Sequence, residues 1–546
     1  MRGILSLITV SDVSLNFSGR LLYDEVNLKF TPGNCYGVIG ANGAGKSTFL
    51  KLLEGKLTPT TGTITTGPNE RISSLNQNHF GFEEFEVLET VIQGHKKLYD
   101  IMKEKEALYA KADFSEEDGL RAADLEAQFA EMDGWNAEAD ASQLLQSVGI
   151  PESMHTQKMS ELSESEKVKV LLAQALFGEP DILLLDEPTN GLDVQTISWL
   201  EDFLADYPKI VIVVSHDRHF LNQVCTEMCD VDFGKIKLYV GNYDFWLESS
   251  QLAAKLQANA NAKKEEKIKE LQEFIARFSA NASKSKQATS RKKQLEKITL
   301  DDIKPSSRKY PFVKFEMQRE LGNDLVRVEN VSKTIDGVKI LDNVSFMIRP
   351  GEKAAIISRN DLATTTLMQI LAGKLEPDTG SVTWGQTAIP SYMPRDLDAN
   401  FNNDELSILD WLRQYADKEQ NDNTFLRGFL GKMLFSGDDI DKQIKVLSGG
   451  EKVRCMLSKM MLEKGNVLLL DDPTNHLDLE SITSLNDALI DFKGSLIFTS
   501  HDHQFIQTIA DHIIEVSDKG VVDRFDTTYD KFLQHETVQA QVKELY

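Results

Sequence analysis

The chain has 546 residues, of which 41% are hydrophobic, so it is too long for one hydrophobic core and too apolar for a disordered protein. Its apolar runs reach about five residues, whereas a membrane-spanning helix needs roughly 20, so the sequence predicts no membrane span. The formal net charge of −25 excludes a protein that coats nucleic acid over its whole surface, but it leaves room for a local basic patch.

The N-terminus and the cysteines favour a cytoplasmic location. The first residues show neither the apolar segment nor the cleavage pattern of a secretory signal. The cysteines form no CxxC pair, so we expect reduced, structural thiols and no zinc or iron–sulfur site. These cysteines are Cys35, Cys225, Cys229 and Cys455.

One module occurs twice in the chain. An offset of 318 residues aligns VSLNFSG with VSKTIDG and IGANGAGKST with ISRNDLATTT. Further along, an offset of 285 aligns LSESEKVKV with LSGGEKVRC, LLLDEPTNGLD with LLLDDPTNHLD, and VSHDRHF with TSHDHQF. The first copy therefore holds about 33 extra residues between these two blocks.

Helical segments are predicted inside the first copy and between the copies. The extra material, within about 95–143, has apolar residues at helical spacing and predicts two antiparallel helices, either a binding element or a solvated elaboration. Between the copies, residues 274–295 carry six basic side chains and no acidic one, which is either a functional patch or a solvated face.

A phosphate-binding loop is predicted in the first copy. The segment GANGAGKST matches the P-loop pattern GxxxxGK[ST], follows an apolar strand and opens a helix, which is the context that the motif requires. Its glycines let backbone N–H groups close around phosphates. We expect Lys46 to neutralise the β- and γ-phosphates of ATP and the Ser47 hydroxyl to ligate Mg²⁺. The predicted nucleotide-binding residues of the loop are Gly40, Ala41, Asn42, Gly43, Ala44, Gly45, Lys46, Ser47 and Thr48.

Five further side chains are expected around the nucleotide. A buried strand ends in two carboxylates, of which Asp186 is expected to hold Mg²⁺ through water and Glu187 to polarise the attacking water. Gln77 follows an apolar strand and is expected to reach the metal and the water. His216 ends another strand and is expected at the γ-phosphate. Phe17 precedes a glycine-containing turn, and its ring either stacks on adenine or belongs to the core.

This ordered set of motifs resembles that of ATP-binding-cassette (ABC) ATPases over nearly the whole chain. The resemblance implies two α/β P-loop domains that pack head to tail, each ATP being held by the P-loop of one and the LSGGQ-like signature of the other. It implies ATP and Mg²⁺, with Ser47, Gln77 and Asp186 as metal ligands and Glu187, His216 and Gln77 as catalytic residues. The signature residues expected at ATP are Ser448, Gly449, Gly450 and Glu451.

The second copy departs from this pattern in its P-loop and catalytic positions but keeps the intact signature LSGGE. The first copy has the eroded signature LSESE. The departing residues of the second copy are Ile335, Ser358, Asp361, Ala363, Thr364, Arg395 and Asp472.

A head-to-tail sandwich explains this exchange, because all intact parts then meet in one composite site and all damaged parts in the other. Asp361 and Glu164 would bring negative charge towards phosphates, and a unit charge at about 4 Å is worth about 4 kcal/mol at an effective dielectric of 20. We therefore expect hydrolysis at one site, with the second site binding nucleotide weakly or serving as a hinge.

The linker and the inserted arm resemble those of the ABC-F family of ribosome-associated ATPases. The linker tract SANASKSKQATSRKKQLEK and the segment YPFVKFE after it carry the likeness. The resemblance implies a translation factor that is closed by ATP and released by hydrolysis, with the ribosome and transfer RNA as partners, and we expect a monomer. The expected RNA-contacting residues of the linker are Lys284, Lys286, Arg291, Lys292 and Lys293.

The resulting prediction is a tandem pair of α/β P-loop ABC domains joined by a long helical linker. The first cassette spans 1–248 with its arm at about 95–143, the linker hairpin 249–323, the degenerate second cassette 324–537 and a tail 538–546. Within the ABC-F prediction the sequence does not choose among translation control, ribosome assembly, rescue of stalled synthesis and antibiotic protection. The alternative is a cytosolic ATPase that works with a separate membrane transporter subunit; a DNA-repair cassette and a binding-only switch fit the residues less well.

Overall fold

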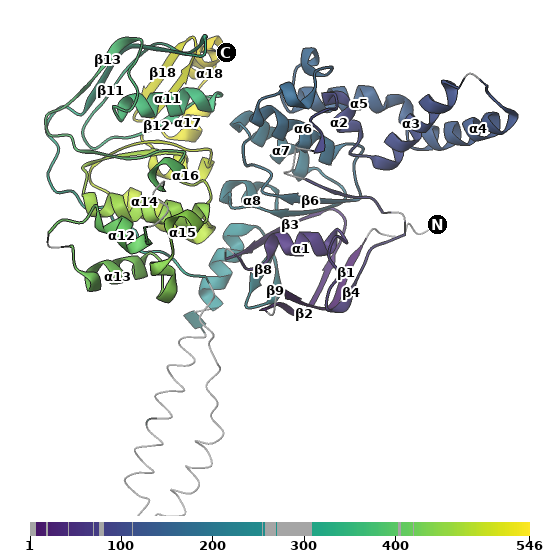
Figure 1. Cartoon of the computed structure of the whole chain (residues 1–546), viewed down its shortest axis with the longest axis horizontal. Helices are drawn as coiled ribbons and strands as arrows, with labels where there is room; N and C mark the ends of the chain where they lie inside the picture. The colour runs from purple at the N-terminus through teal and green to yellow at the C-terminus, as the bar shows by residue number, and fades with distance from the viewer. Residues whose placement is uncertain are drawn as a thin grey trace, which may run out of the picture.

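The computed structural model shows two α/β cassettes side by side, the first drawn in purple to blue and the second in green to yellow (Figure 1). It describes residues 7–17, 20–41, 43–68, 70–75, 81–111, 113–253, 255–256, 269, 308–401, 406–418 and 420–545. The predicted fold class, tandem P-loop cassettes with an arm inserted in the first, is confirmed.

The larger sheet of the first cassette brings three functional segments to one edge. Its strand order is β5-β6-β7-β3-β8-β9, and its pairs are parallel except for β8 and β9. Because β6, β7 and β3 are parallel neighbours, the segments that follow them meet at the carboxyl edge. The strands are β3 (Asn34–Gly40), β5 (Ile72–Ser74), β6 (Ile182–Asp186), β7 (Ile210–Val214), β8 (Glu227–Asp232) and β9 (Lys235–Val240).

The apolar runs of β6 and β7 form the centre of this cassette. Successive side chains point to opposite faces of a strand, so an unbroken apolar run suits a sheet that is covered on both faces. Ile182 and Leu184 pack with Phe49 on one side of the sheet, whereas Leu183 and Leu185 pack in the helical cluster on the other side. This packing fixes the strand whose end carries Asp186.

Helices and a smaller antiparallel sheet cover the two faces. The smaller sheet has the order β2-β1-β4, with β1 (Ile8–Phe17), β2 (Arg20–Phe30) and β4 (Thr61–Thr65). The helices of the body are α1 (Lys46–Leu53), α2 (Val87–Ile92), α5 (Ala137–Ser147), α6 (Glu164–Leu176), α7 (Val194–Ala205) and α8 (Arg218–Val224).

The second cassette repeats this plan. Its larger sheet has the order β14-β15-β16-β12-β17-β18 and its smaller sheet the order β11-β10-β13. The strands are β10 (Val326–Ile335), β11 (Val338–Ile348), β12 (Lys353–Ile357), β13 (Thr379–Trp384), β14 (Pro390–Met393), β15 (Val467–Asp471), β16 (Ser495–Thr499), β17 (His512–Ser517) and β18 (Gly520–Phe525). The helices are α11 (Asp361–Leu371), α12 (Ile408–Arg413), α13 (Asn423–Lys432), α14 (Gly449–Glu463), α15 (Leu479–Asp491), α16 (His503–Ile509), α17 (Tyr529–Gln534) and α18 (Glu536–Leu545).

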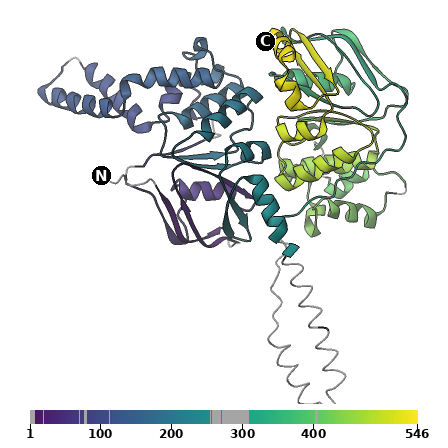
Figure 2. The ribbon, with the colours of Figure 1, turned by 180° about the vertical axis from the view of Figure 1, so that it is seen from behind.

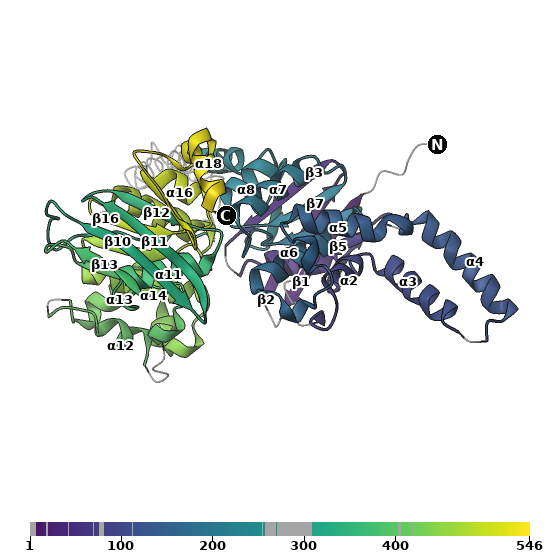
Figure 3. The same ribbon diagram turned by 90° about the horizontal axis from the view of Figure 1, so that it is seen from above.

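The inserted arm extends away from the body of the first cassette (Figure 3). It consists of α3 (Lys96–Tyr109) and α4 (Glu116–Glu131), and α4 begins at a capping box formed by Ser115 and Asp118. Leu108 of α3 and Leu125 of α4 are buried in the same apolar cluster. The periodic apolar residues therefore pack α3 and α4 against each other, and the charged residues lie on the outer faces of the arm.

The cassettes meet through short helices and through the start of α15. The rings of His219 in α8 and His503 in α16 stack with centroids 4.0 Å apart. Leu479, the first residue of α15, packs in the apolar core of the first cassette. The view from behind shows the same side-by-side placement of the two halves (Figure 2). None of the helices described here is both long and apolar enough to cross a bilayer.

Candidate nucleotide-binding site

In the first cassette the P-loop connects β3 to α1 in a non-helical conformation. Gly43 and Gly45 adopt positive φ angles of 76° and 106°, which side chains with a Cβ adopt only at a cost. A Cβ at Gly45 would also lie 2.5 Å from the hydroxyl of Tyr23. The helix therefore begins at Lys46, and its first N–H groups face the loop.

Lys46 lies inside this loop. Its ammonium donates a hydrogen bond to the carbonyl of Gly40 at 2.8 Å, and its side chain is almost fully buried. Burial lowers the pKa of the Lys46 ammonium, while the carboxylates of Glu187, Glu480 and Asp478 favour its charged form. The ammonium is thus held at the position where a P-loop lysine meets phosphate.

Glu187 and His216 form a hydrogen-bonded pair beside Lys46. Glu187 follows β6 with a φ of 50°, a left-handed conformation that is unusual for a non-glycine residue. Its Oε2 accepts a hydrogen bond from the backbone N–H of His216 at 3.1 Å, and its Oε1 lies 3.3 Å from His216 Nε2. The strained backbone therefore aims this carboxyl group at the segment after β7.

Burial sets the protonation of this pair. It raises the pKa of Glu187 to about 8, and it lowers the pKa of His216 to about 3, with Lys46 adding to the second effect. His216 is therefore neutral at pH 7, and Glu187 carries a proton in most molecules. Glu187 needs additional positive charge nearby to act as a base.

The donors beside Lys46 fit Mg²⁺. Asp186 ends β6, and Ser47 lies in the first turn of α1 with its side chain exposed. Carboxylate and hydroxyl oxygens suit Mg²⁺, which is usually held by few protein ligands together with substrate phosphates. No cluster of three or more His, Cys, Asp or Glu side chains that could hold a metal ion occurs among the described residues. Asp186 and Ser47 would hold Mg²⁺, whose positive charge would favour the ionised form of Glu187.

Several predicted residues lie outside the described part of the chain. These are Gln77, Asn42 and the linker residues Lys284, Lys286, Arg291, Lys292 and Lys293. Phe17 is the last residue of β1, and its side chain is not described, so adenine stacking stays a prediction. Of the remaining loop residues, Ala41 and Ala44 lie between β3 and α1, and Thr48 lies in the first turn of α1.

A cavity of about 970 Å³ lies between the cassettes at Lys46. From the first cassette it is lined by Lys46, Asp186, Glu187 and His216, and from the second by residues that include 474–477. Within the described part of the chain, its lining takes no residue from 448–451. The structure therefore brings the first P-loop to the segment before α15 and does not place the predicted signature in the same cavity.

The second cassette replaces the P-loop by helix. Asp361 aligns with Gly43, yet α11 already begins at Asp361, three positions earlier than α1 begins in the first cassette. Asn360 caps this helix by accepting a hydrogen bond from the N–H of Leu362 at 3.0 Å. Because Asp361 and Ala363 carry a Cβ, they suit helical backbone better than the positive φ of the glycines.

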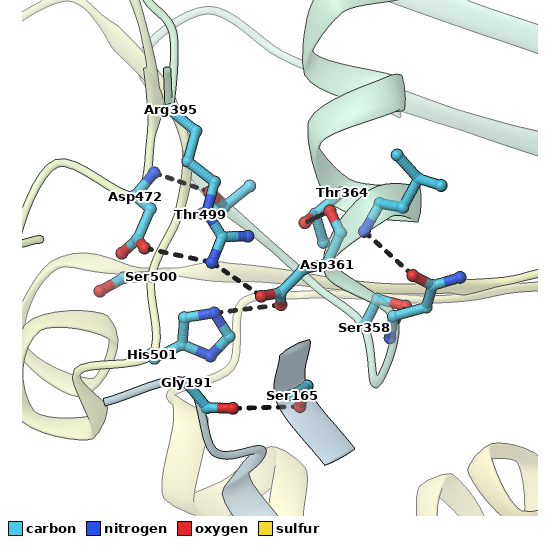
Figure 4. A network of polar contacts seen from close by, with 12 residues as sticks. Ser165, Gly191, Ser358, Asp361, Thr364, Arg395, Asp472, Thr499, Ser500 and His501 are labelled. Atoms are coloured by element: carbon cyan, nitrogen blue, oxygen red, sulfur yellow. Dashed lines mark hydrogen bonds and ion pairs between the residues drawn. The ribbon is translucent and has the colours of Figure 1, made fainter. Parts of the chain in front are cut away.

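Asp361 is also ion-paired. Its carboxylate lies 2.7 Å from Arg395, which stands in place of the predicted glutamine, and 3.1 Å from His501 Nε2 (Figure 4). Although burial opposes ionisation, His501 and Arg395 hold the pKa of Asp361 well below its usual range. Arg395 also lies 3.7 Å from Asp472. The negative charge expected at Asp361 is therefore paired with Arg395 and His501, and its effect on bound phosphate stays a prediction.

In each cassette the signature packs against the residue that precedes the Leu-Asp pair after the strand carboxylates, His476 in the second cassette and Gly191 in the first. A Cβ on Gly449 would lie 2.8 Å from the ring of His476, whereas in the first cassette the residue aligned with His476 is Gly191. There Ser165 donates a hydrogen bond to the carbonyl of Gly191 at 3.1 Å (Figure 4). This local fit, which the sequence analysis missed, is a second reason for the exchanged signatures.

Comparison with known proteins identifies the family. A family model described as "ABC transporter" matches residues 23–190 and 341–475, together more than half of the chain. The chain belongs to the ABC transporter family. A further model with this description matches residues 229–315, which include much of the segment between the cassettes. The matched ABC regions are ATP-binding domains, which indicates ATPase activity.

Relatives of the ABC family match along the whole chain. The ABC transporter ATP-binding protein YkpA of Bacillus subtilis is 62% identical over 540 residues, which are 99% of this chain and 100% of the relative. The probable ATP-binding protein YbiT of Escherichia coli O157:H7 is 47% identical, covering 98% of this chain and 100% of the relative. An archaeal ribosome recycling factor, solved with a ribosomal stalk protein, superposes with a TM-score of 0.58 at 17% identity over 92% of this chain and 87% of that one, which shows a shared fold.

Glu187→Gln is expected to stabilise the protein increasingly as pH rises. The folded pKa of Glu187 is about 8, above the usual value of 4.5, so the stability of the protonated form is complete below about pH 4.5 and is lost as pH rises through 8. Glutamine keeps the neutral form at every pH. Thermal unfolding of both proteins between pH 5 and 9 measures this difference, with the exposed Glu84→Gln as control. A constant difference across this range would contradict the assignment.

Gly449→Ser is expected to destabilise the second cassette, because its Cβ meets the ring of His476. Overpacking of this kind costs about 1–3 kcal/mol. His476 has a φ of 65°, so His476→Gly removes the ring at a position that suits glycine. The double variant should therefore recover most of the lost unfolding temperature, measured by calorimetry. Simple addition of the two single effects would show that the ring does not select the glycine.

Proposed function

We propose that this protein is a ribosome-binding translation factor of ABC-F type, in which ATP binding closes the two cassettes and hydrolysis releases them. The observation that carries the proposal is one basic segment, 274–295, between two cassettes of a chain with a net charge of −25. An acidic body avoids RNA, whereas a basic segment contacts its phosphates. The arm that extends from the first cassette adds a second contact element (Figure 3). We place the protein in the cytoplasm as a monomer with paired cassettes.

In this proposal one composite site hydrolyses ATP. Lys46 neutralises the β- and γ-phosphates, Asp186 and Ser47 hold Mg²⁺ together with Gln77, and Phe17 stacks on adenine. Glu187 accepts a proton from the attacking water once its carboxyl group is ionised. His216 orients the carboxyl group of Glu187 through the 3.3 Å contact between its Nε2 and Oε1 of Glu187. The signature residues from Ser448 to Glu451 complete the site on closure.

The second site is proposed to stay free of hydrolysis. Its P-loop is helical from Asp361 onward, and Asn360 already accepts hydrogen bonds from the N–H groups of Leu362 and Ala363, which would otherwise face phosphate. Arg395 and His501 are already engaged by Asp361. Nucleotide would have to break these ion pairs before it gained any contact, which favours a hinge role for this half.

The second candidate function is an ATPase that works with a separate membrane subunit. The description of the matching family model favours it. A transporter ATPase does not explain why the chain has a basic linker and an inserted arm. The archaeal structure with the same fold is a ribosome recycling factor, which supports the ribosomal candidate at the level of architecture.

Sedimentation of a cell extract through sucrose with ATP separates the two candidates. Glu187→Gln should bind ATP without hydrolysing it and should accumulate with ribosomes, whereas Lys46→Ala should stay at the top of the gradient. Wild-type protein should lie between the two. Recovery of Glu187→Gln with membranes, or at the top of the gradient, would contradict the ribosomal proposal.

ATPase rates test the single-site proposal. Glu187→Gln should lower kcat by about 100-fold or more, since removal of a general base commonly costs that much. The matched change Asp472→Asn, at the aligned position of the second site, should leave kcat within about twofold. Similar losses from both changes would mean that both sites hydrolyse ATP.

A further inference from the structure

Arg308 joins the end of the linker to both cassettes. One side of its guanidinium donates to Asp230 of β8 at 2.6 Å, and the other side donates to Glu480 in the first turn of α15. The guanidinium carbon lies 4.7 Å from the centre of the Trp246 ring, and the indole of Trp246 donates to Asp230 at 3.2 Å. The Arg308 side chain is 8% exposed and that of Glu480 is 2% exposed. Such a desolvated, two-sided pair fixes the positions of its members.

Glu480 is a buried negative charge near the ATP site of the other cassette. Leu479 beside it packs in the core of the first cassette, and residues 474–477 before it line the cavity at Lys46. Leu477 before Glu480 and Ile482 after it both line the cavity that contains Lys46, so the Arg308–Glu480 pair lies beside this cavity. The aligned residue of the first cassette is the uncharged Gln195. The negative charge is therefore specific to the half that faces the intact P-loop.

We propose that Arg308 is a positioning residue for ATP binding, which neutralises Glu480 so that the phosphates of ATP can enter the site at Lys46. Without Arg308, Glu480 would repel the phosphates and compete for Lys46. Arg308 lies within the predicted linker, 249–323, so a movement of the linker that withdrew Arg308 would expose the charge of Glu480 beside the ATP site. This coupling rests on the proposed function, in which the linker contacts the ribosome.

Titration calorimetry with Mg–ATP tests the proposal in a Glu187→Gln chain, in which hydrolysis does not interfere. Arg308→Gln should weaken the Kd for ATP about tenfold, and adding Glu480→Gln should restore it to within about threefold of the parent. Arg308→Lys keeps the charge and should remain within threefold. The exposed neighbour Lys309→Gln is the matched control and should leave the Kd within twofold. Thermal unfolding of each variant identifies loss of the fold.

The rescue by Glu480→Gln separates a charge effect from a structural one, because a second change in a purely structural pair leaves binding weak. An unchanged Kd in Arg308→Gln, or a double variant as weak as the single, would overturn the proposal. Should Arg308→Gln fail to fold, Glu480→Gln alone decides: an equal or tighter Kd supports the proposal, and a tenfold weaker Kd overturns it. Failure of the parent chain to bind ribosomes would contradict the proposed function. The Kd values for ATP would still test whether Arg308 neutralises Glu480.

Discussion

The backbone conformation of two glycines is the main difference between the P-loop of the first cassette and the aligned segment of the second. Gly43 and Gly45 take positive φ angles, so the chain forms an open loop before α1 and surrounds the ammonium of Lys46. In the second cassette Asp361 and Ala363 continue the helix through the same positions. A phosphate cradle depends on free backbone N–H groups, and in the second cassette Asn360 already accepts hydrogen bonds from the N–H groups of Leu362 and Ala363. The two nucleotide sites therefore differ because the P-loop backbone is open in the first cassette and helical in the second.

Charge compensation completes the asymmetry. In the second site Asp361 is ion-paired with Arg395 and His501, whereas in the first site the ammonium of Lys46 donates to the carbonyl of Gly40, and nearby carboxylates favour its charged form. These ion pairs are only partly buried, since 29% of the Arg395 side chain, 39% of that of Asp361 and 31% of that of His501 are exposed. The two sites therefore differ in charge pairing as well as in backbone conformation, which is the basis of the proposal that only the first one hydrolyses ATP.

Much of the fold and part of the site followed from the sequence. The apolar runs before Asp186 and His216, the P-loop pattern and the helical periodicity of the arm are local signals, and each lies where it was expected. The ion pair of Asp361 with Arg395, the contact of Gly449 with His476 and the bridge from Arg308 to Glu480 join residues that are distant in sequence or in different elements. Such contacts depend on how the strands and helices pack, which a motif does not contain.

The number of nucleotides bound per chain tests the central claim most directly. Native mass spectrometry of Glu187→Gln with saturating Mg–ATP measures this number without interference from turnover. One nucleotide per chain, lost on Lys46→Ala, is the result expected when only the loop with Gly43 and Gly45 holds phosphate. Two nucleotides per chain, with one retained in Lys46→Ala, would show that the helical, ion-paired second site also binds ATP and would contradict the account.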